Sequence, residues 1–171
     1  MNKNRSIHSI NIGGEAPDAI SPGPNPTFMV FFQKAGSYPP ENFSKGIKLM
    51  SVVHQRFLPR VKSLSYFPAV VSLQKAKQTG ASELLYISES GDILEGGTVN
   101  FFGVYQGKLY TAEENILWGI TRHYVIELAK KLNIEIILDK IPTSQIKRFD
   151  EAFITSTTRE VMPGKFKAIE K

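Results

Sequence analysis

The sequence lacks cysteine: none of its 171 residues is one, so disulfide bonds and thiolate metal sites are excluded. No apolar run approaches the ~20 residues that a membrane-spanning helix needs. The first twenty residues also lack the apolar core of a signal peptide. We therefore expect a cytoplasmic protein with no membrane partner.

Several common site motifs are also missing. The three histidines are scattered, and none has metal-ligand spacing to another histidine or a carboxylate, so we expect no metal. The glycine turns NIGG and EGGTVN lack the G-x-G-x-x-G and Walker spacings of nucleotide loops. No G-x-S-x-G nucleophile elbow occurs.

The net charge is +5 and the sequence pI is about 9.4. This charge suits an anionic partner, such as a nucleic acid, a phosphorylated cofactor or a carboxylate substrate. The densest basic cluster, HQRFLPRVK at residues 54–62, is too short to favour nucleic acid over a solvated edge. A basic nucleic-acid-binding module therefore has only the charge in its favour.

Strand-like and helical segments are both present, which predicts an α+β fold. Residues 21–28 form a breaker-rich linker. One helix is predicted to begin at Pro68 and to stop at Gly80, and a second spans residues 120–133. Strands are predicted at residues 27–33, 47–54, 83–88, 100–105, 108–111, 134–138 and 151–156.

The helix predicted at residues 120–133 is amphipathic. Val125, Leu128, Ala129 and Leu132 fall on one face at helical spacing. The sequence therefore predicts one apolar face on this helix.

Four short segments carry groups that could do chemistry. RVKSLSYFP places a lysine, Lys62, on the last strand-like residue before a helix, and LEGGTVNFFG places Glu95 at a turn. ILWGITRHYV opens a helix, whose free N–H groups and dipole suit a phosphate. FITSTTREVMP ends a strand in hydroxyl residues.

A lysine, an acid and two phosphate-ready turns are what a pyridoxal phosphate site requires. The lysine forms a Schiff base and moves protons, and the acid keeps the pyridine nitrogen protonated. Each residue alone also has an ordinary interpretation: Lys62 as a solvated lysine, Glu95 as a hairpin acid and Thr121 as a helix cap. Ser156 and Thr157 could be ordinary strand-end residues.

Taken together and in this order, the four segments resemble the class IV aminotransferases, the fold-type-IV pyridoxal phosphate enzymes. That family includes branched-chain aminotransferases, D-amino-acid aminotransferases and aminodeoxychorismate lyases. The similarity runs from NPTFMVFF to EVMP and is strongest over residues 60–163. It implies a large C-terminal α/β domain at 60–171, truncated at its end, after a remnant of the small N-terminal domain and a linker at 1–59.

The resemblance also implies a role for each matching residue. Lys62 matches the lysine that binds pyridoxal phosphate, and Glu95 matches the acid that pairs with the pyridine nitrogen. The two glycines after Glu95 would let the chain turn tightly beneath the ring. Asn100 matches a structural turn residue of the motif.

The remaining matches surround the cofactor. Leu117 matches an apolar residue packed on the ring, and Tyr66 falls where many members place a tyrosine near the cofactor hydroxyl. The phosphate is implied to lie between two walls, one formed by Ile120 and Thr121 and the other by Ser156 and Thr157.

The chain also departs from the family pattern. Members carry a longer N-terminal segment, which supplies an arginine to the phosphate, and Arg56 and Arg60 do not match that arginine by position. The implied activity is transfer of an amino group between an amino acid and a 2-keto acid, by a homodimer. A lyase on the same scaffold and a truncated, non-catalytic remnant are the alternatives.

Overall fold

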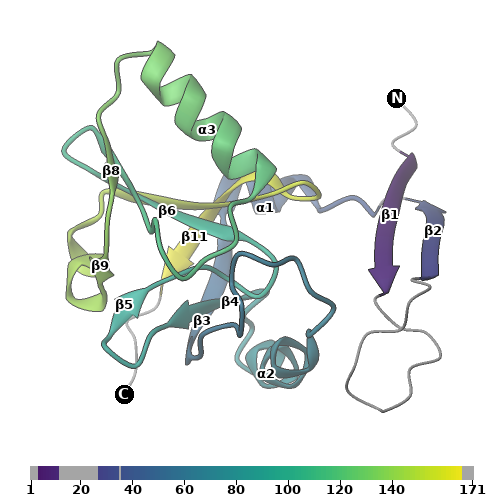
Figure 1. The fold of residues 1–171 in the computed structure, drawn as a ribbon. Coiled ribbons are helices and arrows are strands. Elements are labelled where there is room, and N and C mark those ends of the chain that lie inside the picture. Colours follow the sequence, from purple (N-terminus) through teal and green to yellow (C-terminus); the bar gives the residue numbers. More distant parts are fainter. Residues whose placement is uncertain (1–3, 12–26, 35, 167–171) are drawn as a thin grey trace. The chain divides into compact units, whose positions relative to one another are not determined.

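The structure is a computed structural model that describes residues 4–11, 27–34 and 36–166 (Figure 1). The chain divides into two compact units, Met1–Ser37 and Tyr38–Lys171. The first contains an antiparallel pair, β1 (Asn4–Asn11) and β2 (Thr27–Lys34). The strand predicted at 27–33 is confirmed, whereas most of the predicted linker, residues 21–26, lies outside the described residues.

The second unit is built on a mixed sheet of nine strands in the order β8-β7-β6-β10-β11-β3-β4-β5-β9. The strands are β3 (Ile47–Val53), β4 (Glu83–Ile87), β5 (Asp92–Ile93), β6 (Asn100–Tyr105), β7 (Lys108–Thr111), β8 (Ile136–Leu138), β9 (Ile141–Pro142), β10 (Glu151–Ser156) and β11 (Glu160–Phe166). The helices are α1 (Pro40–Lys45), α2 (Phe67–Gln78), α3 (Ile120–Lys131) and the 3₁₀ helix η1 (Thr143–Arg148). The expected mixture of strands and helices is confirmed.

Strands β3 and β4 are parallel neighbours, joined by a crossover through α2. Parallel strands need such a crossover because a tight turn reverses the direction of the chain and can join only antiparallel strands. Residues 54–66, between β3 and α2, form neither helix nor strand. This irregular segment contains Lys62, so the prediction that Lys62 lies at a strand end is wrong.

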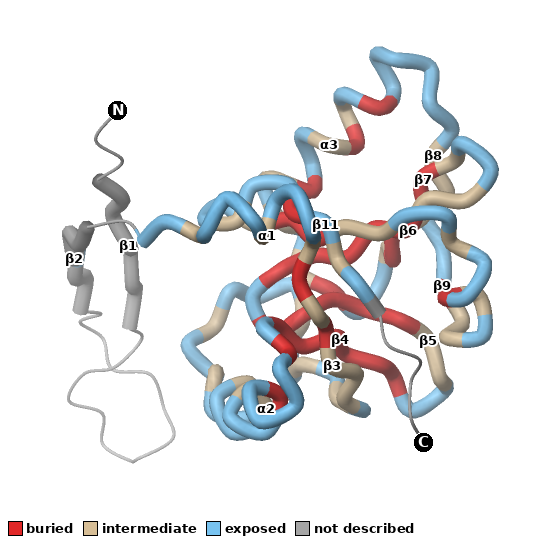
Figure 2. Tube along the Cα trace, turned by 180° about the vertical axis from the view of Figure 1, so that it is seen from behind, coloured by how far each residue is buried: buried red, intermediate tan, exposed pale blue. Residues whose placement is uncertain are grey.

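The core lies on both faces of the sheet. All five residues of β4 are buried, and Figure 2 shows that strand in red. Successive side chains of a strand point to opposite faces. Leu85 and Ile87 accordingly join one apolar cluster, with Phe101 and Ile154, while Leu84 and Tyr86 join a second.

Helix α3 buries only part of the apolar face that the sequence predicted, because Ala129 is the one residue of that face that is buried. The buried residues are Arg122, Ile126 and Ala129. Leu128 and Leu132 are instead more than half exposed. The prediction missed this because Arg122, a charged residue, is buried through polar contacts that hydrophobic spacing does not register.

The second unit begins at Tyr38, earlier than the boundary predicted after residue 59. Strand β3 belongs to the second unit because it pairs with β4 and with β11 inside the nine-stranded sheet. Within residues 4–11, 27–34 and 36–166, no helix has both the length and the apolar character to cross a membrane.

Candidate active site

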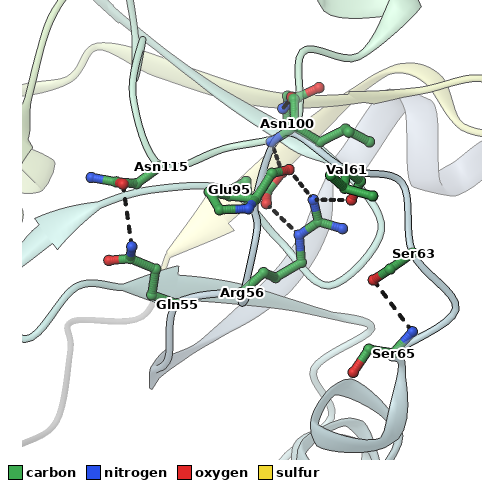
Figure 3. Close-up of polar contacts among 10 residues, drawn as sticks. Gln55, Arg56, Val61, Ser63, Ser65, Glu95, Asn100 and Asn115 are labelled. Carbon is green, nitrogen blue, oxygen red and sulfur yellow. Dashed lines mark hydrogen bonds and ion pairs between the residues drawn. The ribbon is translucent and has the colours of Figure 1, made fainter. Parts of the chain in front are cut away.

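Glu95 is a buried carboxylate between β5 and β6, only 4% exposed. Its Oε1 accepts a hydrogen bond from Arg56 Nε at 2.9 Å (Figure 3). Its Oε2 accepts one from the Leu117 backbone N–H at 3.0 Å. Both oxygens are therefore held from fixed directions. Such an acid is not an ordinary solvated hairpin residue.

The environment of Glu95 sets its pKa close to neutrality. Burial raises the pKa to about 7, against the opposing effects of the Leu117 N–H, Arg56 and Lys62. Lys62 is thus close enough for its charge to act on Glu95. A buried acid with a perturbed pKa and specific cationic neighbours is typical of functional sites.

Two glycines shape the turn after Glu95. A Cβ at Gly96 would lie 2.6 Å from the Leu84 carbonyl oxygen, and one at Gly97 would lie 3.2 Å from Glu83 Oε1. A side chain at position 96 would therefore collide with the backbone of β4, and one at position 97 would crowd the Glu83 carboxylate. The tight turn predicted here is confirmed.

Asn100 fixes the turn that leads into α3. Its Nδ2 donates to the Leu117 carbonyl at 2.7 Å. Its Oδ1 would lie 2.2 Å from a Cβ at Gly119, so no side chain fits there. Glu95 and Asn100 together hold residues 117–119, and the structural role expected for Asn100 agrees with this geometry.

The start of α3 offers free backbone donors. Gly119 is the N-cap, with extended backbone, and no side chain caps the helix. Thr121 is therefore not the cap, which removes that ordinary interpretation. Ile120 and Thr121 occupy the first turn, where backbone N–H groups lack partners within the helix.

Arg56 ties the Lys62 segment to Glu95. Besides the Glu95 contact, Nη2 of Arg56 donates to the carbonyl of Pro59. It also donates to the carbonyl of Val61 at 3.4 Å (Figure 3). Lys62 follows Val61 directly and its side chain is exposed. Sequence reasoning missed this role of Arg56, because nothing in its spacing distinguishes it from the other basic residues at 54–62.

Two further contacts hold the same segment against the loop before α3. Gln55 Nε2 donates to Asn115 Oδ1 at 3.2 Å (Figure 3). The Arg60 guanidinium lies 3.3 Å from the centre of the Trp118 ring, a cation–π contact. The chain around Lys62 is thus anchored at three side chains.

The end of β10 lies beside these groups. Thr155 pairs with Asn100 across the sheet, and Asn100 forms a bridge with Glu95. The next residue, Ser156, accepts a hydrogen bond from the Arg159 N–H at 3.1 Å. Thr157 follows and is exposed.

Tyr66 is half-buried, just before α2. Burial raises the pKa of Tyr86 to about 12, and Tyr66 adds a smaller effect in the same direction. The same pKa also responds to Glu95 and Arg56. In the described part of the chain, no cluster of three histidines or carboxylates could bind a metal ion.

Comparison with known proteins identifies the family of the chain. Residues 4–165 match the family model of amino-transferase class IV. A protein of Methanocaldococcus jannaschii that is named as a branched-chain-amino-acid aminotransferase is 35% identical to this chain over 132 residues. The match covers 73% of this chain and 46% of that protein. A D-alanine aminotransferase of Staphylococcus epidermidis is 32% identical over 147 residues, 84% of this chain and 51% of its own.

A solved structure agrees as well. The T.th. branched-chain amino acid aminotransferase with pyridoxamine 5'-phosphate superposes with a TM-score of 0.81 and 30% identity. The superposition covers 92% of this chain and 55% of that protein. The chain therefore spans about half the length of the relatives that it matches.

Proposed function

The chain belongs to the class IV aminotransferase family. On that premise we propose that the protein is a pyridoxal phosphate-dependent aminotransferase. The reaction would move an amino group between an amino acid and a 2-keto acid. The observation that carries this proposal is Glu95, a buried carboxylate fixed by Arg56 and Leu117, with Lys62 close by.

The chemistry of the donor set fits pyridoxal phosphate. When bound, this cofactor supplies an aromatic ring that withdraws electrons from the substrate carbon. In our proposal, Lys62 binds the cofactor through its side-chain nitrogen and moves a proton. Glu95 faces the pyridine nitrogen and Leu117 packs against the ring. The proposed phosphate contacts are Ile120, Thr121, Ser156 and Thr157, and Tyr66 is assigned to the ring hydroxyl.

The electrostatics of Glu95 support its assignment. A carboxylate opposite a ring nitrogen is useful only if it is ionised, because its charge is what keeps that nitrogen protonated. Burial works against ionisation, whereas Arg56, the Leu117 N–H and Lys62 favour it. We propose that Arg56 keeps enough negative charge on Glu95 for this task.

The wider assignments follow the relatives. Proteins 32–35% identical to this chain are named aminotransferases, which favours transfer over the lyase reaction. We also propose a homodimer, because large apolar side chains are exposed around Lys62, including Phe57 and Leu64. A cytoplasmic location stays a prediction from the sequence.

Covalent trapping at Lys62 tests the proposal. The purified chain is mixed with pyridoxal phosphate and treated with borohydride, which fixes the cofactor on the lysine that holds it. Peptide mass spectrometry should find the added mass on Lys62. The reason is that Lys62 is close enough to Glu95 for its charge to act on that carboxylate.

Two lysines of α2 serve as internal controls. Lys75 and Lys77 are exposed near the end of that helix, so they report non-specific modification. A label distributed equally over Lys62, Lys75 and Lys77 would sink the assignment. A Lys62→Met variant should lose the specific label while keeping the background on the other two.

A further inference from the structure

A closed polar network lies next to the candidate site. Arg159 Nη1 is 3.0 Å from Glu83 Oε2 and donates to Thr98 Oγ1 at 2.8 Å. Thr98 Oγ1 in turn donates to the same Glu83 oxygen at 2.9 Å. The second oxygen of Glu83 accepts the Leu84 N–H at 2.8 Å. The three side chains thus contact one another pairwise.

The ion pair of this network is buried, although Thr98 is exposed, and that burial makes its composition informative. Glu83 is 2% exposed, and the Arg159 side chain is 12% exposed. Removing two charges from water is costly, and a buried ion pair is often no more stable than apolar residues of the same volume. Simple stabilisation is therefore a weak reason for placing an ion pair here.

The three residues come from three separate places in the fold. Glu83 begins β4, Thr98 belongs to the turn that follows Glu95, and Arg159 belongs to the turn between β10 and β11. Arg159 also donates its backbone N–H to Ser156 Oγ at 3.1 Å. One residue therefore links the Glu95 turn to the turn that contains Ser156 and Thr157.

We infer that Arg159 is a positioning residue that sets the Ser156–Thr157 turn at a fixed distance from Glu95. This inference rests on the proposed function, in which that turn contacts the phosphate and Glu95 faces the ring nitrogen. A rigid cofactor reaches both ends of its site only if the two are correctly spaced. In this inference Arg159 acts through the contacts of its Nη1 with Glu83 and Thr98.

The glycine next to Thr98 supports this linkage. A Cβ at Gly97 would lie 3.2 Å from Glu83 Oε1, a crowded contact, so the lack of a side chain there favours the close approach of the turn to the carboxylate. The Arg159 guanidinium also lies 5.0 Å from the centre of the Tyr38 ring, which limits its movement on another side. The network is thus held by packing as well as by hydrogen bonds.

Two variants separate positioning from stability. Arg159→Met alone would leave the Glu83 carboxylate buried and unpaired, so it is combined with Glu83→Gln, which removes both charges. Thr98→Val keeps the ion pair and removes only the hydroxyl that joins it to the Glu95 turn. Because position 98 is exposed, this second variant should fold even if the double variant does not.

Affinity for two probes is measured by spectroscopic titration of the purified chain. Pyridoxal phosphate and pyridoxal differ only in the phosphate, so their ratio reports the phosphate end of the site. We expect the double variant to weaken pyridoxal phosphate binding about tenfold, equivalent to about 1.4 kcal/mol. Pyridoxal binding should change by less than about twofold on the same scale, and Thr98→Val should change the ratio in the same direction.

A matched ion pair elsewhere provides the control. Lys108 and Glu135 lie 2.8 Å apart and are both well exposed, so Lys108→Met with Glu135→Gln should alter neither affinity. Equal losses for both probes in the Arg159 and Thr98 variants, or no loss, would overturn the inference while leaving the proposed function intact. A parent chain that binds neither probe would overturn both.

Discussion

Glu95 shows at the scale of one residue how burial and charge compete. Its carboxylate has an ordinary pKa of 4.5, and burial raises that pKa to about 7 although Arg56 and the Leu117 N–H oppose the change. The folded chain therefore binds a proton at Glu95 more tightly than the unfolded chain does. The tighter proton binding stabilises the folded chain at pH values below the pKa that Glu95 has in the unfolded chain. The stabilisation is lost as the pH rises through the pKa that Glu95 has in the folded chain.

The first prediction follows from that sign. Glu95→Gln cannot titrate, so the difference in unfolding free energy between parent and variant should depend on pH. Between about pH 4.5 and pH 8 the parent should lose up to about 3 kcal/mol relative to the variant, at about 1.36 kcal/mol per pKa unit. Urea unfolding at several pH values measures this difference. Parallel pH curves for the two proteins would contradict the raised pKa.

The sequence could indicate the residue types of the candidate site but not all their contacts. Lys62 and Glu95 stand out because an amine and an acid recur in a known order of segments. Arg56 does not stand out, because its contact with Glu95 joins residues 39 positions apart. Such a contact depends on the irregular path of residues 54–66, which local patterns do not specify.

At the scale of elements, the sequence indicated the long helices and most of the strands, because their periodicity is local. The short strands β5 and β9 were missed, since a two-residue strand has no period to read. β11 was missed as well. It contains a proline and a glycine, and its pairing changes from β10 to β3 along its length. That pairing is a property of the sheet as a whole.

The second prediction tests the buried face of α3. Ile126 is 6% exposed, whereas Leu128, which the hydrophobic spacing had placed on the apolar face, is 57% exposed. Ile126→Ala should lower the free energy of unfolding by about 2–4 kcal/mol, because it creates a cavity. Leu128→Ala should cost less than about 0.5 kcal/mol. Urea denaturation distinguishes the two, and equal losses would show that the face is assigned incorrectly.

At the scale of the whole molecule, the segment around Lys62 presents an unusual surface. Apolar side chains more than half exposed occur at Phe57, Leu58, Val61, Leu64 and Phe67. Large exposed apolar patches often mark interaction surfaces, and these five side chains lie within eleven residues of the sequence. We propose that a second copy of the chain covers this segment, which would also restrict the movement of Lys62.

The last prediction is that this segment controls self-association. Aromatic side chains dominate interface energies, so Phe57→Ser with Phe67→Ser should weaken dimerisation by at least about tenfold. Sedimentation velocity over a range of concentrations measures the change in the dissociation constant. Leu132→Ser, a substitution at an exposed position beyond the end of α3, is the matched control and should leave the dimer unchanged. A parent chain that stays monomeric at high concentration would refute the homodimer, whereas equal weakening by the control would mean that the surface lies elsewhere.

Because the same segment contains Lys62, the double variant should also bind less pyridoxal phosphate covalently, and borohydride trapping can measure that loss on the same samples.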